Sequence, residues 1–201
     1  MPTASQAKHK FCRRIGQCLW GDPKCPSVKR PYPAGPHGKG RRAKLSTYGE
    51  LQLEKQKLRY YYAISEKQLR IAYAKAKAGT GQTHEKLFRS LEQRLDAMVF
   101  RAGFAPTIFA AKQIVNHGHV YVNGKRVDRS SYIVKEGSVI SIDAEKSPAI
   151  AELAKKNNAN PPPAYLEVDL DNLKATLVRA PQVEEIPVQV KIMSVIEYYA
   201  R

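Results

Sequence analysis

The feature that most constrains the fold is a change in the spacing of apolar residues at Gly118. From Tyr48 to this glycine, apolar residues recur at every third or fourth position, which is typical of amphipathic helices. After it they alternate, and Val120 and Val127 flank Asn123-Gly124, a dipeptide typical of a two-residue β-hairpin turn. The sequence therefore predicts an α+β fold in which short helices pack on a small hairpin sheet.

Capping residues and turns indicate the boundaries of the elements. Ser65 is a typical N-cap for a helix that runs to about Ala78, where the turn Gly79-Thr80-Gly81 ends it. Thr83 is expected to cap one continuous helix that ends near Gly103. The other expected elements are a helix from Pro106 to Gly118, strands at 132–134, 139–142, 165–170 and 175–179, a polar helix from Ser147 to about Asn158, and an apolar element over 192–199.

Positive charge is concentrated in the N-terminal part of the chain. The sequence holds 34 Lys and Arg against 18 Asp and Glu, a net charge of +16, whereas residues 143–201 are slightly acidic. Such an excess is typical of proteins that bind polyanions, because phosphate neutralisation releases counterions. Residues 1–47 are also rich in proline and keep no apolar period, so they are predicted to be an extended basic arm that needs a metal ion or a partner to become ordered. A mostly helical domain is predicted at 48–93 and 143–201, with a separate module at 94–142.

The sequence excludes two classes of protein. No stretch approaches the ~18 consecutive apolar residues of a membrane span, and the N-terminus lacks the apolar core of a signal peptide. Three cysteines are too few, and odd in number, for a secreted disulfide scaffold. The expected class is an intracellular protein that binds nucleic acid.

The arm contains four candidate metal ligands. His9, Cys12, Cys18 and Cys25 follow the spacing His-x2-Cys-x5-Cys-x6-Cys, in which the short gap can present two ligands to one tetrahedral ion and a second pair can close the site. The pattern predicts a structural Zn²⁺ knuckle. Two alternatives stay open: a site in which His37 is the fourth ligand, and a metal-free arm with three thiols.

Polar and basic side chains of residues 94–142 are expected to form one RNA-binding patch. Arg94 and Arg101 are seven residues apart, which indicates one helical face, and further side chains gather on the next helix and the hairpin. A patch built from several elements suits recognition of RNA shape and phosphate positions. With basic residues of the arm and of the first long helix, the predicted RNA-binding residues are Arg13, Arg14, Lys39, Arg41, Arg42, Lys44, Lys57, Arg59, Arg94, Arg101, Lys112, Gln113, Asn116, His117, His119, Asn123, Lys125 and Arg126.

Residues 94–142 resemble the small RNA-binding module first described in the fourth protein of the small ribosomal subunit. The resemblance rests on Arg94-Leu95-Asp96, on a Lys-Gln-Ile-Val helix ending in His117-Gly118-His119, and on the strand motif Val-Asn-Gly-Lys-Arg-Val at 122–127. Position 108 is usually basic in this family, so Ile108 indicates a lost phosphate contact or a wider apolar face. The flanking segments that also resemble this ribosomal protein are Arg30 to Gly38, Glu54 to Arg59, Tyr165 to Asp169 and Ile196 to Tyr199.

This resemblance implies a structural ribosomal protein of the bacterial or organellar type and not an enzyme. It implies primary binding to small-subunit ribosomal RNA, nucleation of the subunit body, contact with the fifth small-subunit protein and an influence on decoding accuracy. It also implies a position near messenger RNA entry, and zinc, since some family members carry a four-cysteine zinc site in this arm. A cytoplasmic ribosome is expected, with an organellar one left open.

Two other functions use the same module and stay as alternatives. One is an RNA-modifying enzyme, because Arg94-Leu95-Asp96 is similar to the catalytic Arg-Leu-Asp of pseudouridine synthases. The flanks of the module, however, lack a second large core that could hold a catalytic pocket. The other alternative is a free regulatory RNA-binding protein.

Overall fold

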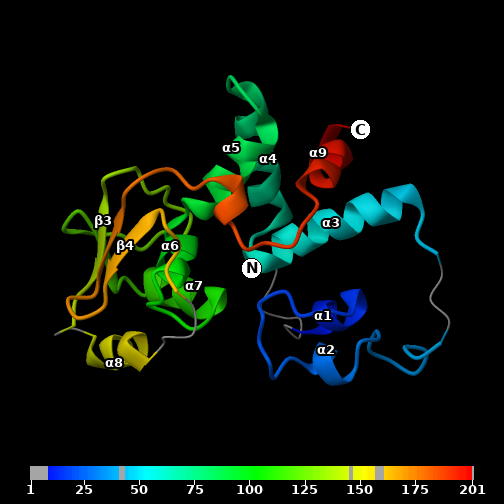
Figure 1. Ribbon diagram of the computed structural model, residues 1–201, viewed down its shortest axis with the longest axis horizontal. Helices are drawn as coiled ribbons and strands as arrows, with labels where there is room; N and C mark the ends of the chain where they lie inside the picture. The colour runs from blue at the N-terminus through cyan, green and yellow to red at the C-terminus, as the bar shows by residue number, and fades with distance from the viewer. Residues whose placement is uncertain (1–8, 41–43, 145–146, 157–160, 201) are drawn as a thin grey trace. The chain divides into compact units, whose positions relative to one another are not determined.

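The computed structural model describes residues 9–40, 44–144, 147–156 and 161–200. The chain divides into two compact units, one of residues 1–74 with 188–201 and one of residues 75–187. No helix within the described residues has the length and apolar character needed to cross a membrane. The structure is mixed helix and sheet, as predicted from the change in apolar spacing (Figure 1).

The first unit is helical where it is described. Its elements are α1 (Lys10–Ile15), α2 (Pro26–Lys29), α3 (Thr47–Tyr61), the greater part of α4 (Glu66–Ala78) and α9 (Ile192–Ala200). The predicted cap of α4 is confirmed, because the Ser65 hydroxyl accepts a hydrogen bond from the Gln68 amide and the Gln68 side chain accepts one from the Ser65 amide. A similar cap starts α3, where the Ser46 side chain accepts from the Gly49 amide.

Aromatic contacts attach the arm to α3. Phe11 stacks on Tyr60 with ring centroids 4.4 Å apart, and the indole N–H of Trp20 donates to the Tyr61 carbonyl at 3.2 Å. Tyr61 and Tyr62 are themselves buried, so these neighbours of Tyr60 pack within the first unit. The expectation that only a metal ion or a partner orders the arm was therefore incomplete, because these aromatic contacts also order it.

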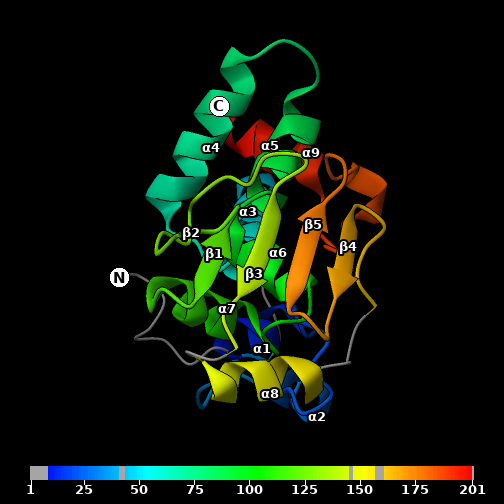
Figure 2. The same cartoon turned by 90° about the vertical axis from the view of Figure 1, so that its left-hand side faces the viewer.

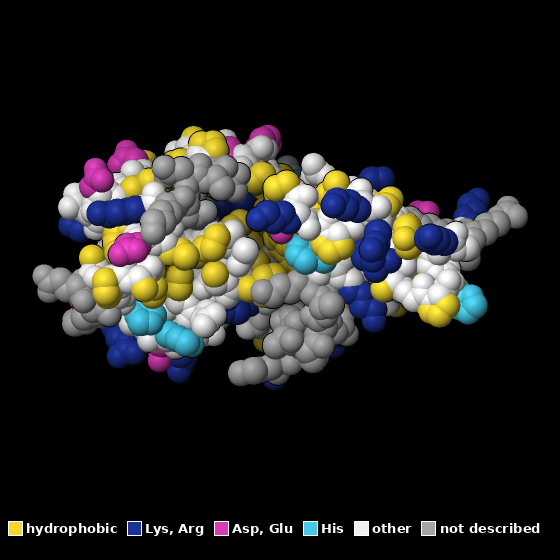
Figure 3. All heavy atoms as spheres, turned by 90° about the horizontal axis from the view of Figure 1, so that it is seen from below, with side chains coloured by type: hydrophobic (Ala, Val, Ile, Leu, Met, Phe, Trp, Pro, Cys, Tyr) yellow, Lys and Arg dark blue, Asp and Glu magenta, His cyan; other side chains and the backbone are white. Residues whose placement is uncertain are grey.

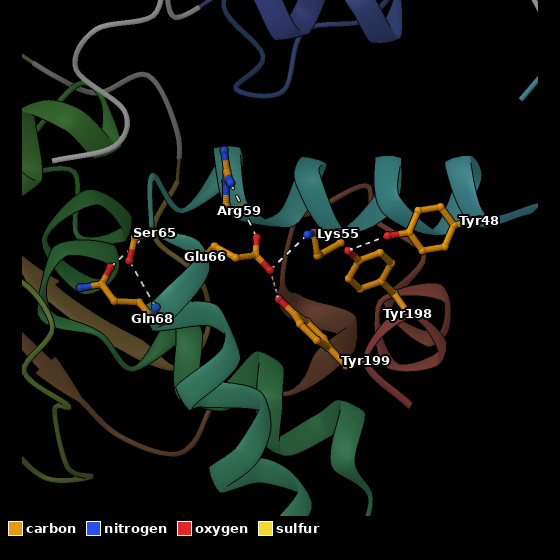
Figure 4. A network of polar contacts seen from close by, with 8 residues as sticks. All are labelled: Tyr48, Lys55, Arg59, Ser65, Glu66, Gln68, Tyr198 and Tyr199. Carbon is orange, nitrogen blue, oxygen red and sulfur yellow. Dashed lines mark hydrogen bonds and ion pairs between the residues drawn. The ribbon is translucent and has the colours of Figure 1, made fainter. Parts of the chain in front are cut away.

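Polar contacts hold the C-terminal helix α9 against α3 and α4 (Figure 4). The Glu66 carboxylate accepts from the Lys55 ammonium at 3.1 Å and from the Tyr199 hydroxyl at 2.8 Å. Lys55 also lies 4.3 Å from the centre of the Tyr198 ring, whose hydroxyl is 3.2 Å from that of Tyr48. Burial alone would raise the pKa of Glu66, but its hydrogen bonds to Tyr199 and Lys55 lower the pKa below its ordinary value.

The second unit is a five-stranded antiparallel sheet with helices (Figure 2). The strand order is β2-β1-β3-β5-β4, so a strand pair from the end of the chain continues the sheet begun by the predicted hairpin. The hairpin turn has positive φ at both Asn123 and Gly124, as its sequence predicted. The elements are α5 (Thr83–Glu92), α6 (Leu95–Arg101), α7 (Ile108–Asn116), β1 (Val120–Val122), β2 (Lys125–Arg126), β3 (Val139–Ile142), α8 (Pro148–Lys156), β4 (Leu166–Asp169), β5 (Lys174–Leu177) and η1 (Val183–Glu185).

Helices α6 and α7 cover one face of this sheet (Figures 1 and 2). Their buried side chains, among them Leu95, Val99 and Val115, join a single apolar core with inward-facing residues of the strands such as Val120 and Ile140. Ile108 is also buried, so the departure at this position widens the apolar face of α7. The core fixes the position of the turn that follows α7.

Three local predictions were wrong. The helix expected from Thr83 to Gly103 is broken at Arg94, whose extended backbone (φ −65°, ψ 142°) pairs with Ile133 in an isolated bridge. Thr83 is the first residue of α5 and not its side-chain cap. Residues 132–134 contribute only that bridge and no strand, because Arg94, and not a neighbouring strand, is their partner.

Candidate nucleic-acid interface and metal centre

The four candidate metal ligands lie together in the arm. One donor atom from each of His9, Cys12, Cys18 and Cys25 lies within 4.8 Å of all the others, and Nδ1 of His9 is 3.1 Å from the Cys25 sulfur. A tetrahedral zinc ion with bonds of about 2.0–2.3 Å needs ligand atoms in such a cluster. His37 is exposed and lies outside this group, so the structure favours His9 as the fourth ligand. The residues fit a zinc ion.

The environment of the three sulfurs differs. Burial raises the pKa of the Cys12 thiol to about 12 and also raises that of Cys18. Burial acts in the same direction on Cys25, but hydrogen bonds with Ser27, Cys18 and Cys12 together outweigh it and lower the pKa of this thiol. A metal ion must displace the protons of such buried thiols, so its binding is expected to weaken in acid.

About half of the predicted RNA-binding residues are exposed. Arg41 and Arg42 lie outside the described residues, and His119 is half-buried. Figure 3 shows one face of the molecule, on which Lys and Arg side chains lie at intervals among hydrophobic ones. The predicted residues that the structure leaves exposed are Arg14, Lys39, Lys44, Gln113, Asn116, His117, Asn123, Lys125 and Arg126.

Other predicted RNA-binding residues of the first unit bind groups of the protein itself. The Arg13 guanidinium donates to the carbonyls of Tyr32 and Pro33, at 3.1 and 3.2 Å, and so holds the following part of the arm. Lys57 pairs with the carboxylate of Glu54, three residues earlier on α3, and Arg59 is 3.6 Å from that of Glu66. The first of these pairs could have been found from its helical spacing alone.

In the second unit, Arg94, Arg101 and Lys112 are also engaged. Arg94 donates two hydrogen bonds to the Asp96 carboxylate, at 3.0 and 2.7 Å, and the Lys112 ammonium is 3.6 Å from the same carboxylate. Arg101 pairs with the fully buried Glu92. Burial lowers the pKa of Lys112, although Asp96 opposes this shift. Arg94 and Arg101 do not share an exposed helical face, because Arg94 lies at the break before α6 and both side chains are held in ion pairs with little exposure.

This ion-pair cluster also bears on the alternative enzyme function. Asp96 corresponds to the catalytic aspartate of the Arg-Leu-Asp motif, yet its side chain is only 1% exposed and is bound by Arg94. A carboxylate held in this way cannot reach a substrate. Its arrangement is that of a structural ion pair.

The turn between α7 and β1 positions the exposed part of the interface. Gly118 has φ of +74°, and a β-carbon there would collide with the guanidinium of Arg126. Arg126 donates to the His117 carbonyl at 3.4 Å, so its side chain lies against the turn. The Asn123 side chain accepts from the Val139 amide at 2.8 Å, which joins the hairpin to β3.

Three further residues near this turn were missed by sequence analysis. A cleft of about 210 Å³, called here the histidine cleft, is lined by His117, His119, Tyr121, Arg126, Asp143 and Ser147. Tyr121 and Arg126 are cross-strand partners, and Ser147 is 2.6 Å from Nδ1 of His119. Strand register would have placed Tyr121 beside Arg126, but no local pattern links Asp143 and Ser147 to the turn.

Comparison with known sequences identifies the family. The profile of the S4 domain matches residues 93–140, and that of the ribosomal protein S4/S9 N-terminal domain matches residues 4–92. The chain belongs to the ribosomal protein S4 family. The small ribosomal subunit protein uS4 of Pelagibacter ubique is 48% identical over 200 residues, covering 97% of each chain. The uS4 proteins of Paracoccus denitrificans and Ruegeria sp. are 47% and 46% identical over the full length of both chains.

Membership of the S4 family confirms the predicted resemblance. The two matched domains together span the basic arm, the helices up to α5 and the module of α6, α7 and the hairpin. The prediction of a ribosomal protein and not an enzyme is confirmed by the same relatives. The S4 domain coincides with the part of the chain where the exposed polar side chains gather around the turn after α7.

Proposed function

We propose that this chain is a structural component of the small ribosomal subunit that binds its ribosomal RNA. The observation that carries the proposal is the exposed polar surface at the end of α7 and on the β1–β2 hairpin, which includes Gln113, Asn116, His117, Lys125 and Arg126. These groups sit on a rigid core, so they present donors in a fixed geometry to phosphate and sugar oxygens. Whole-chain similarity to uS4 proteins supports the same function.

The arm is proposed to supply a second part of the interface. Arg14, Lys39 and Lys44 are exposed cations on an element with almost no acidic residues. Zinc bound by His9 and the three cysteines would hold α1 and α2 together, and with them the orientation of Arg14 on α1. The zinc ion has no catalytic part in this proposal.

The finer roles of the family are proposed for this chain on the basis of its membership. They are early binding that nucleates the subunit body, contact with the fifth small-subunit protein, an influence on translational accuracy, and a position of the Lys39–Lys44 segment near messenger RNA entry. The acidic C-terminal part, residues 143–201, is the better candidate for protein contact, since like charges disfavour RNA there. Ribosomes of the cytoplasm are the proposed location.

Simultaneous Lys125→Ala and Arg126→Ala substitutions are expected to weaken binding to small-subunit ribosomal RNA and to flatten its salt dependence. The slope of log affinity against log salt should become shallower by up to about two phosphate equivalents. With each cation removed, one phosphate fewer is neutralised and binding releases about one counterion fewer from the RNA. Filter binding across a salt series measures this slope.

The matched control for this experiment is Lys135→Ala with Lys155→Ala. Both lysines are exposed in the same unit but lie outside the proposed interface. This variant has the same loss of net charge and should keep a slope close to that of the unmodified chain. A slope that is the same in both double variants would remove the hairpin from the interface.

A further inference from the structure

The histidine cleft has the size of a site for one small planar group. Its volume of about 210 Å³ is below the roughly 300–1,000 Å³ typical of pockets for drug-sized ligands. The cleft lies where α7 gives way to β1, at the centre of the exposed residues assigned above to RNA. A single nucleobase that has left its stack is the fragment of RNA that such a space can receive.

Planar side chains dominate the lining of the cleft. The rings of His117 and His119 have centroids 6.2 Å apart and are inclined at 45°. The Arg126 guanidinium is held by the His117 carbonyl, and Tyr121 lies opposite Arg126 in the hairpin. Imidazole, phenol and guanidinium groups are those on which unstacked bases of RNA stack. This composition favours a base over an isolated phosphate.

The polar groups of the cleft indicate which base it accepts. Asp143 is its acidic lining residue, and a carboxylate repels phosphate but accepts two N–H donors side by side. Guanine presents such a pair on its Watson–Crick edge, in N1–H and the exocyclic amino group, whereas adenine, cytosine and uracil do not. The His119 ring, another part of the lining, is fixed by its hydrogen bond with the buried Ser147, so this part of the cleft is preorganised.

We propose that the histidine cleft binds one unstacked guanine of the RNA, with Asp143 accepting from its N1–H and amino group. The inference rests on the proposed function, since the base belongs to the RNA bound by the surrounding surface. It adds base selection to an interface whose other residues are proposed to bind the RNA backbone. Sequence reasoning assigned the two histidines to RNA in general but gave Asp143 no role.

Titration of the full chain with mononucleotides tests the cleft directly. The imidazole resonances of the five histidines are followed by NMR during addition of GMP, IMP, AMP or inorganic phosphate at matched ionic strength and fixed pH. GMP should shift the signals of His117 and His119 and leave those of His9, His37 and His84 unchanged. The affinities for AMP and phosphate should be lower than that for GMP by about fivefold or more. The affinity for IMP, which lacks the amino group, should lie between those for GMP and AMP.

Asp143→Asn should abolish the preference for GMP over AMP, and the matched control Asp128→Asn, at an exposed residue outside the cleft, should keep it. Equal binding of GMP, AMP and phosphate by the unmodified chain would overturn the proposal without the use of any variant. A preference that survives Asp143→Asn would overturn it as well. If the chain binds small-subunit RNA but does not prefer GMP, only the guanine site is refuted. If it prefers GMP but does not bind that RNA, the proposed function is refuted.

Discussion

Cys18→Ser is expected to release one zinc ion per chain and to disorder the first part of the arm, residues 9–30. Few apolar side chains are available in this segment, and beyond the contacts of Phe11 and Trp20 with α3 it depends on the cluster of His9 and three cysteines. Apparent zinc binding energies of roughly 10–16 kcal/mol in small zinc peptides become folding energy, so the loss of one ligand has a large effect. The S4 domain should stay folded, because its core is separate.

Two measurements check this expectation. Elemental analysis of protein purified without chelator should give one zinc per chain, and the variant should give far less. Trp20 is the single tryptophan of the chain, and its ring centroid lies 5.8 Å from that of His9. Its fluorescence should therefore report the disordering of the arm in the variant. Gln17→Ser, at the exposed neighbour of Cys18, is the matched control and should retain both signals. The zinc knuckle would be disproved if the unmodified protein contained no zinc and its arm were cut by protease at the same rate as the arm of the Cys18→Ser variant.

Asp96→Ala is expected to destabilise the second unit by about 3–5 kcal/mol, the usual cost of breaking a buried ion pair. Asp96 is buried and is the shared partner of Arg94 and Lys112. Without its carboxylate, the almost fully buried Arg94 keeps its charge with no counterion beside it. The substitution should also weaken the backbone bridge between Arg94 and Ile133 at the break between α5 and α6.

Hydrogen exchange of α6 and α7 measures this effect, since protection in the core reports the free energy of opening. Asp171→Ala, at an exposed aspartate of the same unit, is the control and should change protection little. Trp20 fluorescence should not respond to either substitution, because the tryptophan belongs to the first unit. Equal protection in the two variants would show that the ion-pair cluster has no structural role.

Local sequence patterns predicted the elements whose stability depends on local chemistry. The Ser65 cap, the Asn123-Gly124 turn and the end of α7 at Gly118 each follow from a side chain or a φ value that neighbouring residues determine. The clustering of the four candidate metal ligands could also be predicted, because their spacing along the chain limits how they can meet. The break at Arg94 could not, because it depends on pairing with Ile133, 39 positions away.

Non-local pairing likewise explains what was missed in the sheet and the interface. Strands were expected at 165–170 and 175–179, close to the observed β4 and β5, but no local pattern indicates that β5 pairs with β3, for example Ile140 with Ala175, and so extends the hairpin sheet. Basic residues were predicted to bind RNA because of their charge. The structure shows that some of them, such as Arg101 with Glu92, instead form ion pairs with little exposure inside the protein. Charge in a sequence predicts the class of partner, whereas the ion pairs of the fold decide which cations are available to it.

Sedimentation of the tagged chain with ribosomal subunits tests the central proposal most directly. A lysate containing the tagged chain is separated on a sucrose gradient after a moderate salt wash. The tag should migrate with the small subunit at about one copy per subunit RNA, and it should be depleted from that peak by Lys125→Ala with Arg126→Ala but not by Lys135→Ala with Lys155→Ala. A tag that stays at the top of the gradient, or that follows the large subunit, would contradict the proposed function.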